Sequence, residues 1–587
     1  MMPCPRGQQN SATSVHADND ETIIVTATYE PLPLKESDRS VDVLPVEDLN
    51  VLLHSWADAL REDPAIDLGQ RAPGTQADIS MRGGSFGQTL ILVDGIRVNE
   101  AQSGHHNLDL PIPLAAVGRI EVLHGSGSTL YGSDAVGGAV NFITAAPVST
   151  ELRLAAGGGN FGSNNESGTA SLLARRWTER LSFTRDFSSG FMPDRDYRNF
   201  AAASGTRVSS SWGDSSLLLG LSDRPFGADQ FYGNFNSWER TKGWLAAAKQ
   251  QFGGDADVEL AYRRHTDEFI LLRDQPAVYE NNHATESWQA AVRERARLSD
   301  NNRLFYGAEF FRDSIDSNNL GRHARQRGAA YLDLDARAIG RFSLSLGGRE
   351  EAFAPGNAVF SPSVSGGYAI SEHLRLRASL AHAYRLPSYT DLYYSDPGNI
   401  GNPNLRPEKA WGYEAGISWE LPRVSLSATL FERREHDVID YIRDGASSVY
   451  RAANIQSLRF TGVELLAHLK LLRSQFDFGY TSLYGAQRAL AGEESKYVFN
   501  YPTNQASVQW LGSTFGKVSA RVRAGITQPY RASAYPLVEL SLLRRFGRVT
   551  PYLQMENLTN TGYEEIQGVR MPGRSYSGGL EIILWRR

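Results

Sequence analysis

The chain has 587 residues, with 60 basic and 66 acidic side chains and a formal net charge of −6. A nucleic-acid-binding protein would carry a strongly basic surface, so this balance excludes that class. A single cysteine, Cys4, excludes a disulfide framework and a cysteine-based zinc cluster. No run of about 18 apolar residues occurs, which excludes a membrane-spanning helix. The 55 glycines, 25 tyrosines and 25 phenylalanines favour an all-β chain with many tight turns.

The N-terminal tail, residues 1–20, is polar and has no apolar pattern. A secretory signal needs a basic start followed by about 7–15 apolar residues, and MMPCPRGQQNSATSVHADND has neither. We expect that an export signal is missing from this start, because later features indicate an exported protein. Residues 21–28 begin with ETIIVTA, a β-prone run with no hairpin partner evident beside it.

Residues 29–148 combine short apolar runs with turn signals, and we expect one globular α+β domain here. In LILVDGIRVN, Asp94 and Gly95 separate two alternating apolar runs, which predicts a hairpin with a type I′ turn. The glycine-rich residues 117–144 lack the Lys and Ser or Thr of a phosphate-binding loop, and Leu130 stands where the dinucleotide fingerprint requires glycine. Tight turns between short strands are the expected structure of this segment.

Residues 149–587 repeat one pattern of alternating apolar and polar side chains. In RFSLSLGGRE, Phe342, Leu344 and Leu346 fall on one face of a strand, whereas Ser343 falls on the other. The number of such segments and the aromatic residues near their ends predict a membrane barrel with an apolar outer surface and a polar lumen. The length fits 22 antiparallel strands of about ten residues, joined by connections of about ten residues on average.

A barrel of this width cannot be filled by its own side chains, so residues 29–148 are the candidate plug. Long polar stretches at 223–241, 271–287 and 385–408 are the candidate outer loops. A passive porin or structural barrel would lack both the plug and the segment at 21–28. A soluble β-rich enzyme would need a convergent acid, base or nucleophile constellation, which the sequence does not offer, so we expect no enzyme.

Five blocks in a fixed order carry a resemblance to a known family. They are ETIIVTA, DISMRGG, LILVDGIRVN, RIEVLHGSGSTLYGSDAVGGAVNFIT and NPNLRPEKAWGYEAG, and the chain ends in a strand with LEIILW. With this order and spacing, the sequence resembles the TonB-dependent outer-membrane transporters over essentially its whole length from residue 21. The compact length and the wording YGSDAVGGAVNFIT are most similar to the cobalamin-transporter branch.

The resemblance implies an all-β membrane protein: a 22-stranded antiparallel transmembrane β-barrel at 149–587, with the plug at 29–148 inside the lumen. It implies a location in the outer membrane of a Gram-negative-type bacterium, in contact with its lipid. The implied function is TonB-dependent active uptake of a scarce large ligand, with cobalamin first and a ferric siderophore as the alternative. A nickel or carbohydrate ligand and a cooperating surface lipoprotein stay open.

The resemblance also implies that residues 21–28 are the TonB box, a segment that adds as a strand to the TonB energy-coupling protein. Such strand addition gains affinity from main-chain hydrogen bonds and selectivity from alternate side chains. The segment would then lack a partner in this chain because its partner is another protein. The alternative is that it is simply the first strand of the plug. The box residues are Thr22, Ile23, Ile24, Val25 and Thr26.

Residues that hold the plug in the barrel are assigned by the same resemblance. Arg82, Arg119 and Glu121 match plug positions that face the barrel wall in the family. Glu408 and Glu414 match barrel carboxylates that pair with plug arginines. Desolvated Arg–carboxylate pairs are oriented and often bidentate, which suits a lock between two domains. Ordinary exposed ion pairs, which contribute little, are the alternative.

Ligand contacts are predicted in the outer loops and on the plug loop EAQSGHHNLDLP, residues 100–111. The adjacent histidines of this loop are interpreted as hydrogen-bonding groups of a solvated loop. A metal site is disfavoured because neighbours on an extended chain point apart and no carboxylate stands at ligand spacing. Tyrosines of the outer loops are candidates because amphipathic aromatics bind large planar ligands. The predicted contacts are Ser103, His105, His106, Asn107, Tyr232, Tyr279, Tyr393 and Tyr394.

Calcium is the one ion that the resemblance suggests as a ligand of this protein. In the cobalamin branch, acidic outer loops bind calcium and order the binding face. Asp194 and Asp196 in GFMPDRDYRNF have the spacing to offer oxygens to one such hard cation. We predict this pair as a possible calcium site and expect no other cofactor.

Overall fold

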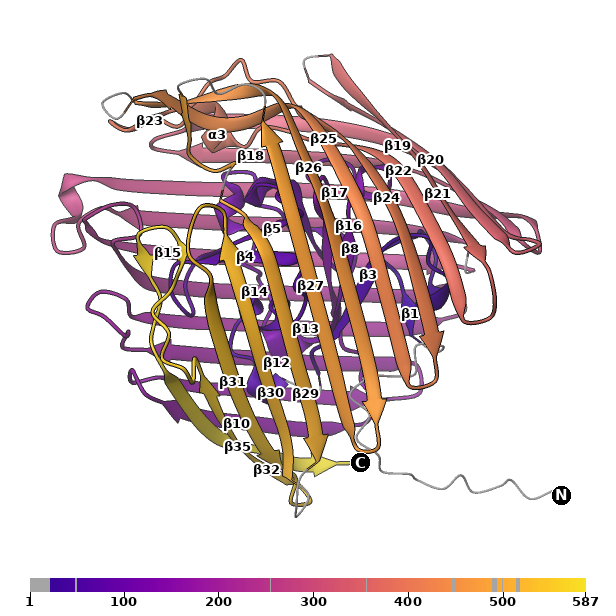
Figure 1. The fold of residues 1–587 in the computed structure, drawn as a ribbon, viewed down its shortest axis with the longest axis horizontal. Coiled ribbons are helices and arrows are strands. Elements are labelled where there is room, and N and C mark those ends of the chain that lie inside the picture. Colours follow the sequence, from indigo (N-terminus) through magenta and orange to yellow (C-terminus); the bar gives the residue numbers. More distant parts are fainter. Residues whose placement is uncertain are drawn as a thin grey trace.

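The computed structural model describes residues 22–587 apart from 48–49, 254, 355, 446–448, 488–492, 499 and 514–517. A barrel of long strands encloses the N-terminal plug domain (Figure 1). The predicted tail and Glu21 of the predicted TonB box lie outside the described residues. Within the described part of the chain, no helix is long and apolar enough to cross a membrane.

The plug is built on a five-stranded sheet of order β3-β8-β9-β6-β7, in which β6 and β9 run parallel. As predicted, Asp94 and Gly95 join β6 to β7, with φ of 50° and 87°. The elements are β1 (Ile23–Ile24), β2 (Leu32–Pro33), η1 (Leu34–Glu36), β3 (Val41–Pro45), η2 (Asn50–Leu52), α1 (Trp56–Leu60), β4 (Ile66–Gln70), β5 (Ala77–Met81), η3 (Phe86–Gln88), β6 (Thr89–Val93), β7 (Ile96–Arg97), η4 (Gly104–His106), η5 (Leu114–Ala116), β8 (Val117–His124), α2 (Ser128–Tyr131) and β9 (Gly138–Thr144).

The barrel is closed and antiparallel, and its 22 long strands end where β35 pairs with β10. The first half contains β10 (Glu151–Gly159), β11 (Asn164–Leu173), β12 (Trp177–Ser188), β13 (Tyr197–Ser210), β14 (Gly213–Asp229), β15 (Asn236–Phe252), β16 (Ala256–Ile270), η6 (Pro276–Val278), β17 (Glu280–Ser299), β18 (Asn302–Ser317), β19 (Gly321–Ile339) and β20 (Phe342–Phe353). The second half contains β21 (Asn357–Ala369), β22 (Leu374–Arg385), α3 (Tyr389–Tyr393), β23 (Asn399–Ile400), β24 (Glu408–Leu421), β25 (Val424–Asp444), β26 (Tyr450–Leu471), β27 (Ser474–Gln487), β28 (Glu493–Ser495), β29 (Pro502–Ser513), β30 (Val518–Pro529), β31 (Tyr535–Arg544), β32 (Val549–Glu556), β33 (Glu564–Ile566), β34 (Val569–Arg570) and β35 (Ser575–Arg586).

The predicted alternation gives the barrel its two surfaces. On β12, Leu181 and Phe183 are exposed on the outer surface, whereas Arg180 and Ser182 are buried against the plug. An apolar outer surface matches hydrocarbon, and the polar inner surface offers hydrogen-bonding groups to the plug. The lumen of the barrel is therefore a polar interface between two domains.

The strands are longer than predicted, and the connections are shorter. β26 has 22 residues, and most of the predicted loop 223–241 lies in β14 and β15. The predicted loop 271–287 contains η6 and the start of β17, whereas 385–408 is a connection that carries α3 and β23. Polar side chains do not end a strand here, because hydrogen bonds to neighbouring strands satisfy the main chain beyond the apolar belt as well as within it.

Candidate functional site

The predicted TonB box has a partner within this chain, contrary to the prediction. Ile23–Ile24 (β1) pairs antiparallel with Leu32–Pro33 (β2), and the Leu34 amide donates to the Thr22 carbonyl at 2.8 Å. Ile24 is fully buried against the plug. The run LPL at residues 32–34 is the signal that would have predicted this pairing. The segment is thus docked as the first strand of the plug.

The carboxylate of Glu121 anchors the docked segment. Its Oε2 accepts hydrogen bonds from the Val25 amide at 2.8 Å and the Thr26 hydroxyl at 2.6 Å. Its Oε1 accepts two from Arg119, at 2.7 and 2.9 Å, and Arg119 also donates to the Ile23 carbonyl at 3.3 Å. The prediction that Arg119 and Glu121 face the barrel wall is wrong. They are two residues apart on β8, so both project from the plug face that holds the box.

Two further plug side chains hold Thr26. The Tyr131 hydroxyl donates to the Thr26 carbonyl at 2.9 Å, and the Asn141 side chain donates to the Thr26 hydroxyl at 3.1 Å. Every hydrogen bond described here between the box and a side chain comes from the plug. Rearrangement of the plug is therefore a direct way to release the segment.

Arg82 reaches the barrel wall, as the resemblance implies. Its guanidinium makes two hydrogen bonds to Glu464 of β26, at 2.8 and 2.6 Å, and lies 3.2 Å from Glu414 of β24. Burial disfavours the charge on Arg82, but Glu464 and Glu414 outweigh it and hold the arginine pKa above its usual value. Glu464 was not predicted, because nothing in its strand pattern distinguishes it from other inward polar residues.

His124 extends this network at the end of β8. Its Nε2 lies 3.1 Å from Asp63 and its Nδ1 lies 3.7 Å from Glu464. Burial lowers the pKa of His124, but Asp63 and Glu464 raise it to about 10, so the ring is charged at neutral pH. The next residue, Gly125, has a φ of +81°, and a Cβ added there would collide with the Glu414 carboxylate. Glycine at this position lets the plug main chain approach the barrel carboxylate of Glu414 closely.

Glu408 also lies at the plug–barrel interface, but its predicted partner is wrong. Its Oε1 accepts a hydrogen bond at 2.8 Å from Arg385, which is a barrel residue. Its Oε2 accepts one at 2.8 Å from the plug residue Gln88, which also donates to Glu435 at 2.8 Å. Arg385 lies directly opposite Glu408 in the β22–β24 register, so the barrel itself neutralises this carboxylate. A plug amide, not a plug arginine, completes the contact.

The predicted ligand loop of the plug is compact. Ser103 caps the N-terminus of η4, and its hydroxyl accepts a hydrogen bond from the His105 amide at 3.4 Å. Asn107 is buried; it accepts from the Glu100 amide at 2.9 Å and donates to the Phe86 carbonyl at 3.1 Å. Ser103 and Asn107 therefore shape the loop, and the predicted solvated loop is wrong.

His105 presents the partly exposed imidazole of this loop. Its Nδ1 lies 2.7 Å from Asp78, and its ring stacks on Phe86 with centroids 3.9 Å apart. The ring edge of Tyr497, from an outer connection of the barrel, packs nearby. Burial lowers the pKa of His105 more than Asp78 raises it, which keeps the ring neutral at pH 7. Plug and barrel aromatics thus meet at the position where a ligand contact was predicted.

His106 faces the barrel wall and is surrounded by carboxylates. Its Nδ1 lies 3.1 Å from Asp109 and 3.9 Å from Glu239, and its Nε2 lies 3.5 Å from Asp267. The prediction that no carboxylate stands at ligand spacing is wrong. Asp109 approaches across a turn, and Glu239 and Asp267 come from β15 and β16. Burial disfavours charge on His106, but Asp267 and Asp109 outweigh it and raise its pKa well above the usual value.

The four predicted tyrosines divide into two places. Tyr393 and Tyr394 pack on one buried cluster at the outer ends of β18 and α3, and Tyr279 is joined to this region through Asn319, which donates to its hydroxyl at 3.3 Å. Tyr232 lies between β14 and β15, where its hydroxyl donates to the Glu239 carboxylate at 3.0 Å. Tyr232 therefore belongs with the residues around His106.

Asp194 and Asp196 are paired with an arginine. Arg273 lies 3.0 Å from Asp194 and makes a two-point contact with Asp196, with one of its hydrogen bonds at 3.0 Å. All three side chains are partly exposed, at 31–38%. A calcium ion at this pair would have to displace the guanidinium, and the calcium assignment stays a prediction.

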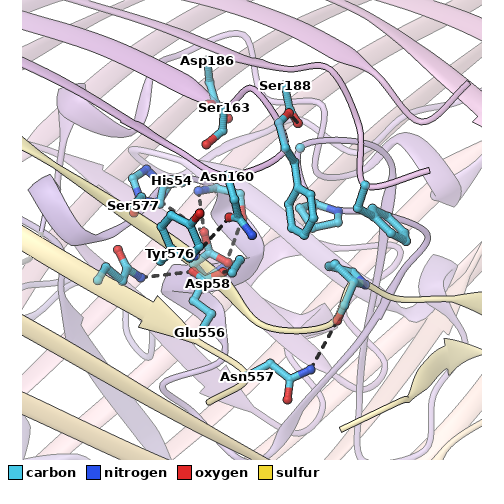
Figure 2. A pocket seen from close by; sticks show the side chains of 18 of the residues that line it. His54, Asp58, Asn160, Ser163, Asp186, Ser188, Glu556, Asn557, Tyr576 and Ser577 are labelled. Carbon is cyan, nitrogen blue, oxygen red and sulfur yellow. Dashed lines mark hydrogen bonds between the residues drawn. The ribbon is translucent and has the colours of Figure 1, made fainter. Parts of the chain in front are cut away.

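A separate pocket opens between the plug and the strands that close the barrel (Figure 2). His54 and Asp58 of the plug face Asn160, Glu556 and Tyr576 of the barrel across it. None of the predicted ligand contacts lines this pocket. Its tyrosine, histidine and amide groups offer a second surface for a polar ligand.

Comparison with known families identifies both the barrel and the plug. Residues 128–563 match the family described as TonB dependent receptor-like, beta-barrel, and residues 33–139 match the TonB-dependent Receptor Plug Domain. The barrel match covers well over half of the chain. The chain belongs to the TonB-dependent receptor family. It is a TonB-dependent outer-membrane transporter, and its plugged lumen excludes the passive-porin alternative.

Relatives of this transporter include two kinds of protein. It is 25% identical over 549 residues to the vitamin B12 transporter BtuB of Photobacterium profundum, which covers 89% of each chain. It is 25% identical over 562 residues to the iron-regulated outer membrane virulence protein of Vibrio cholerae, which covers 84% of this chain and 82% of that protein. A solved mutant of the ferric enterobactin receptor PfeA of Pseudomonas aeruginosa has the same fold, with a TM-score of 0.78, 16% identity, and coverage of 96% of this chain and 100% of that one.

Proposed function

We propose that this transporter takes up cobalamin across the outer membrane with energy supplied through TonB. The observation that supports this cargo is the end-to-end similarity to a vitamin B12 transporter, which extends over 89% of both chains. Cobalamin is large and planar, and aromatic groups such as His105, Phe86 and Tyr497 at the outer face of the plug suit such a ligand.

Energy coupling is proposed to act through the docked TonB box. The box is held by Glu121, Tyr131 and Asn141, all from the plug. Ligand binding on the outer face favours a plug state with weaker contacts to the box, so the exposed population of the box rises. The TonB protein then captures the segment by strand addition and pulls on the plug. The exposed edge of Ile23 offers the first contact for that partner.

The remaining partners are proposed on the same basis. Outer-membrane lipid would cover the apolar outer surface of the barrel, of which Leu181 and Phe183 are examples. Calcium at Asp194 and Asp196 would order an outer connection after displacement of Arg273. A surface lipoprotein would cover the outer loops.

Direct titration tests the cargo. The purified barrel in detergent is titrated with cobalamin, with and without calcium, and intrinsic tryptophan fluorescence is followed. Saturable quenching by cobalamin, together with TonB-dependent uptake in cells that lack another cobalamin transporter, is the expected result. Absence of both would reject cobalamin as the cargo and leave the family assignment untouched.

A ferric siderophore is the second candidate. The observations in its favour are the iron-regulated relative in Vibrio cholerae and solved structures of siderophore receptors with the same fold. A panel of ferric siderophores is measured beside cobalamin in the same titration. Saturable quenching by one siderophore, without a response to cobalamin, would select this candidate.

A further inference from the structure

Two histidines and three carboxylates meet where the plug loop with η4 contacts β15 and β16. His106 and Asp109 come from the plug, and Glu239, His265 and Asp267 come from the barrel. Their exposed fractions lie between 1% and 5%. These five residues are called the interface cluster below. Because the cluster takes ligand-type side chains from both domains, only the docked plug completes it.

The donor atoms of the interface cluster have separations suited to one small ion. His106 Nδ1 lies 3.1 Å from Asp109, and His265 Nε2 lies 3.4 Å from the same side chain, so these three residues can face one ion. Asp267 lies 3.5 Å from Nε2, the other nitrogen of the His106 ring, and together with Glu239 it forms an alternative set around His106. An ion with bonds of about 2.0–2.1 Å holds tetrahedral ligands roughly 3.3 Å apart. Two overlapping sets that share His106 each keep their donor atoms within 4.8 Å of one another.

Several polar atoms of the interface cluster point at each other without a hydrogen bond. Both ring nitrogens of His265 lack a hydrogen-bond partner, as do Oε1 of Glu239 and Oδ1 of Asp267. His265 is 99% buried, since its exposed fraction is 1%. Buried polar atoms are nearly always satisfied, and leaving one unpaired costs about 1–3 kcal/mol. The His265 imidazole, whose nitrogens face Glu100 and Asp109 at 3.4 Å without forming hydrogen bonds, is therefore the feature that points to a ligand.

The ion pairs around the interface cluster show which of its carboxylates lack an arginine or lysine partner. Arg224 pairs with Asp109, and Arg263 pairs with the neighbouring Glu100. Among the residues that the structure describes, Glu239 and Asp267 form ion pairs with histidine alone. Neither of these buried carboxylates has an arginine or lysine partner in the described part of the chain, so both remain available to a cation.

Groups outside the interface cluster orient its carboxylates. The Gln102 side chain donates to Asp267 at 2.7 Å, and the Tyr232 hydroxyl donates to Glu239 at 3.0 Å. Such second contacts fix the ligands of metal sites in place. Asp267 also lines an open hollow at the outer ends of β16, β17 and β18.

We propose that the interface cluster binds one divalent transition-metal ion, with zinc as the best fit. Imidazole with carboxylate suits zinc and its neighbours cobalt and nickel, whereas calcium and magnesium prefer sites made of oxygen alone. The bound ion joins the plug to the barrel through His106 and Asp109 on one side and His265 of β16 on the other. The site is separate from the calcium prediction at Asp194 and Asp196, and it does not depend on the cargo.

Metal retention by the full, tag-free chain tests the proposal. The protein is stripped with a chelator, loaded with zinc, desalted and analysed for metal by mass spectrometry, and its affinity is measured by competition with a zinc chelator. We expect about one zinc per chain. In the double variant His265→Gln Asp267→Asn, we expect an affinity at least roughly 100-fold weaker. Cobalt(II) absorption, measured in parallel, is expected to show nitrogen and oxygen coordination in the wild type but not in the double variant.

A matched control separates this site from unspecific binding. His382→Gln changes another buried barrel histidine, which contacts Ser361 and Trp411 instead of carboxylates, and it is expected to retain zinc like the wild type. If the double variant fails to refold, His265→Gln alone is measured, with an expected loss of roughly 10- to 100-fold. The proposal is overturned if the wild type retains no zinc. It is also overturned if the variants of the interface cluster retain as much zinc as the wild type. The same samples are also titrated with cobalamin, so that failure of the metal proposal can be distinguished from failure of the cobalamin proposal.

Discussion

Replacement of Glu121 by glutamine is expected to loosen the docked TonB box. The side chain is fully buried, and its Oε2 accepts hydrogen bonds from the Val25 amide at 2.8 Å and the Thr26 hydroxyl at 2.6 Å. Hydrogen bonds to a charged group contribute about 1.5–3 kcal/mol each, against about 0.5–1.5 kcal/mol for neutral pairs. An amide can accept the same two bonds but without the charge. The docked state should therefore lose about 2–3 kcal/mol relative to the released state.

The weaker docked state of the Glu121→Gln variant is expected to increase its affinity for TonB. Since about 1.4 kcal/mol corresponds to a factor of ten, the released population rises roughly 30- to 150-fold. A partner that binds only the released segment has an apparent Kd equal to its intrinsic Kd divided by the released fraction. As long as that fraction is small in the wild type, the affinity of the variant for the soluble periplasmic domain of TonB should increase by the same factor.

The measurement is titration of the ligand-free transporter in detergent with this TonB domain. Glu36→Gln is the matched control, because it makes the same chemical change at an exposed plug glutamate beside the same hairpin. Equal TonB affinity in the wild type, Glu121→Gln and Glu36→Gln would refute the anchoring role of Glu121. Thr26→Val, which removes the hydrogen bonds of the Thr26 hydroxyl to Glu121 and Asn141, should also increase the TonB affinity.

Three further predictions concern the contacts between plug and barrel. Glu464→Gln leaves the Arg82 guanidinium with a weaker buried partner and should lower the free energy of plug unfolding by about 3 kcal/mol in urea titrations, whereas no change would mean that the pair is not a lock. Gly125→Ala should destabilise the docked plug in the same titration, because the left-handed φ and the adjacent Glu414 carboxylate both oppose a Cβ; a stability equal to the wild type would contradict this. His124 has a folded pKa of about 10, above its unfolded value near 6.5, so its contribution is complete below pH 6.5 and is lost as the pH rises through 10. The urea midpoint of the wild type should therefore fall over this pH range more than that of His124→Gln, and parallel curves would show that His124 does not titrate there.

Local patterns determined the fold class. The period-two alternation in segments such as RFSLSLGGRE indicates strands with one apolar face, and it depends only on neighbouring residues. The Asp94–Gly95 turn is equally local, since the need for positive φ at two adjacent positions selects these residue types. The family blocks supplied the plug and the count of strands. Strand lengths were underestimated because composition does not show where a hydrogen-bonded ladder stops.

The sequence by itself determined the barrel and the plug, and it predicted residues 21–28 as the TonB box, because each is specified by residues close together in the chain. Only the tertiary structure decided the partners of the buried charges. Glu121 holds Thr26 across 95 positions, Arg82 reaches Glu464 across 382, and His106 meets Asp267 from a different domain. Such pairs depend on the register of distant strands and on how the plug is oriented in the lumen. Neither property leaves a periodic signal in the sequence. Both decide which carboxylates hold the plug in the barrel, which anchor the docked segment and which belong to the interface cluster.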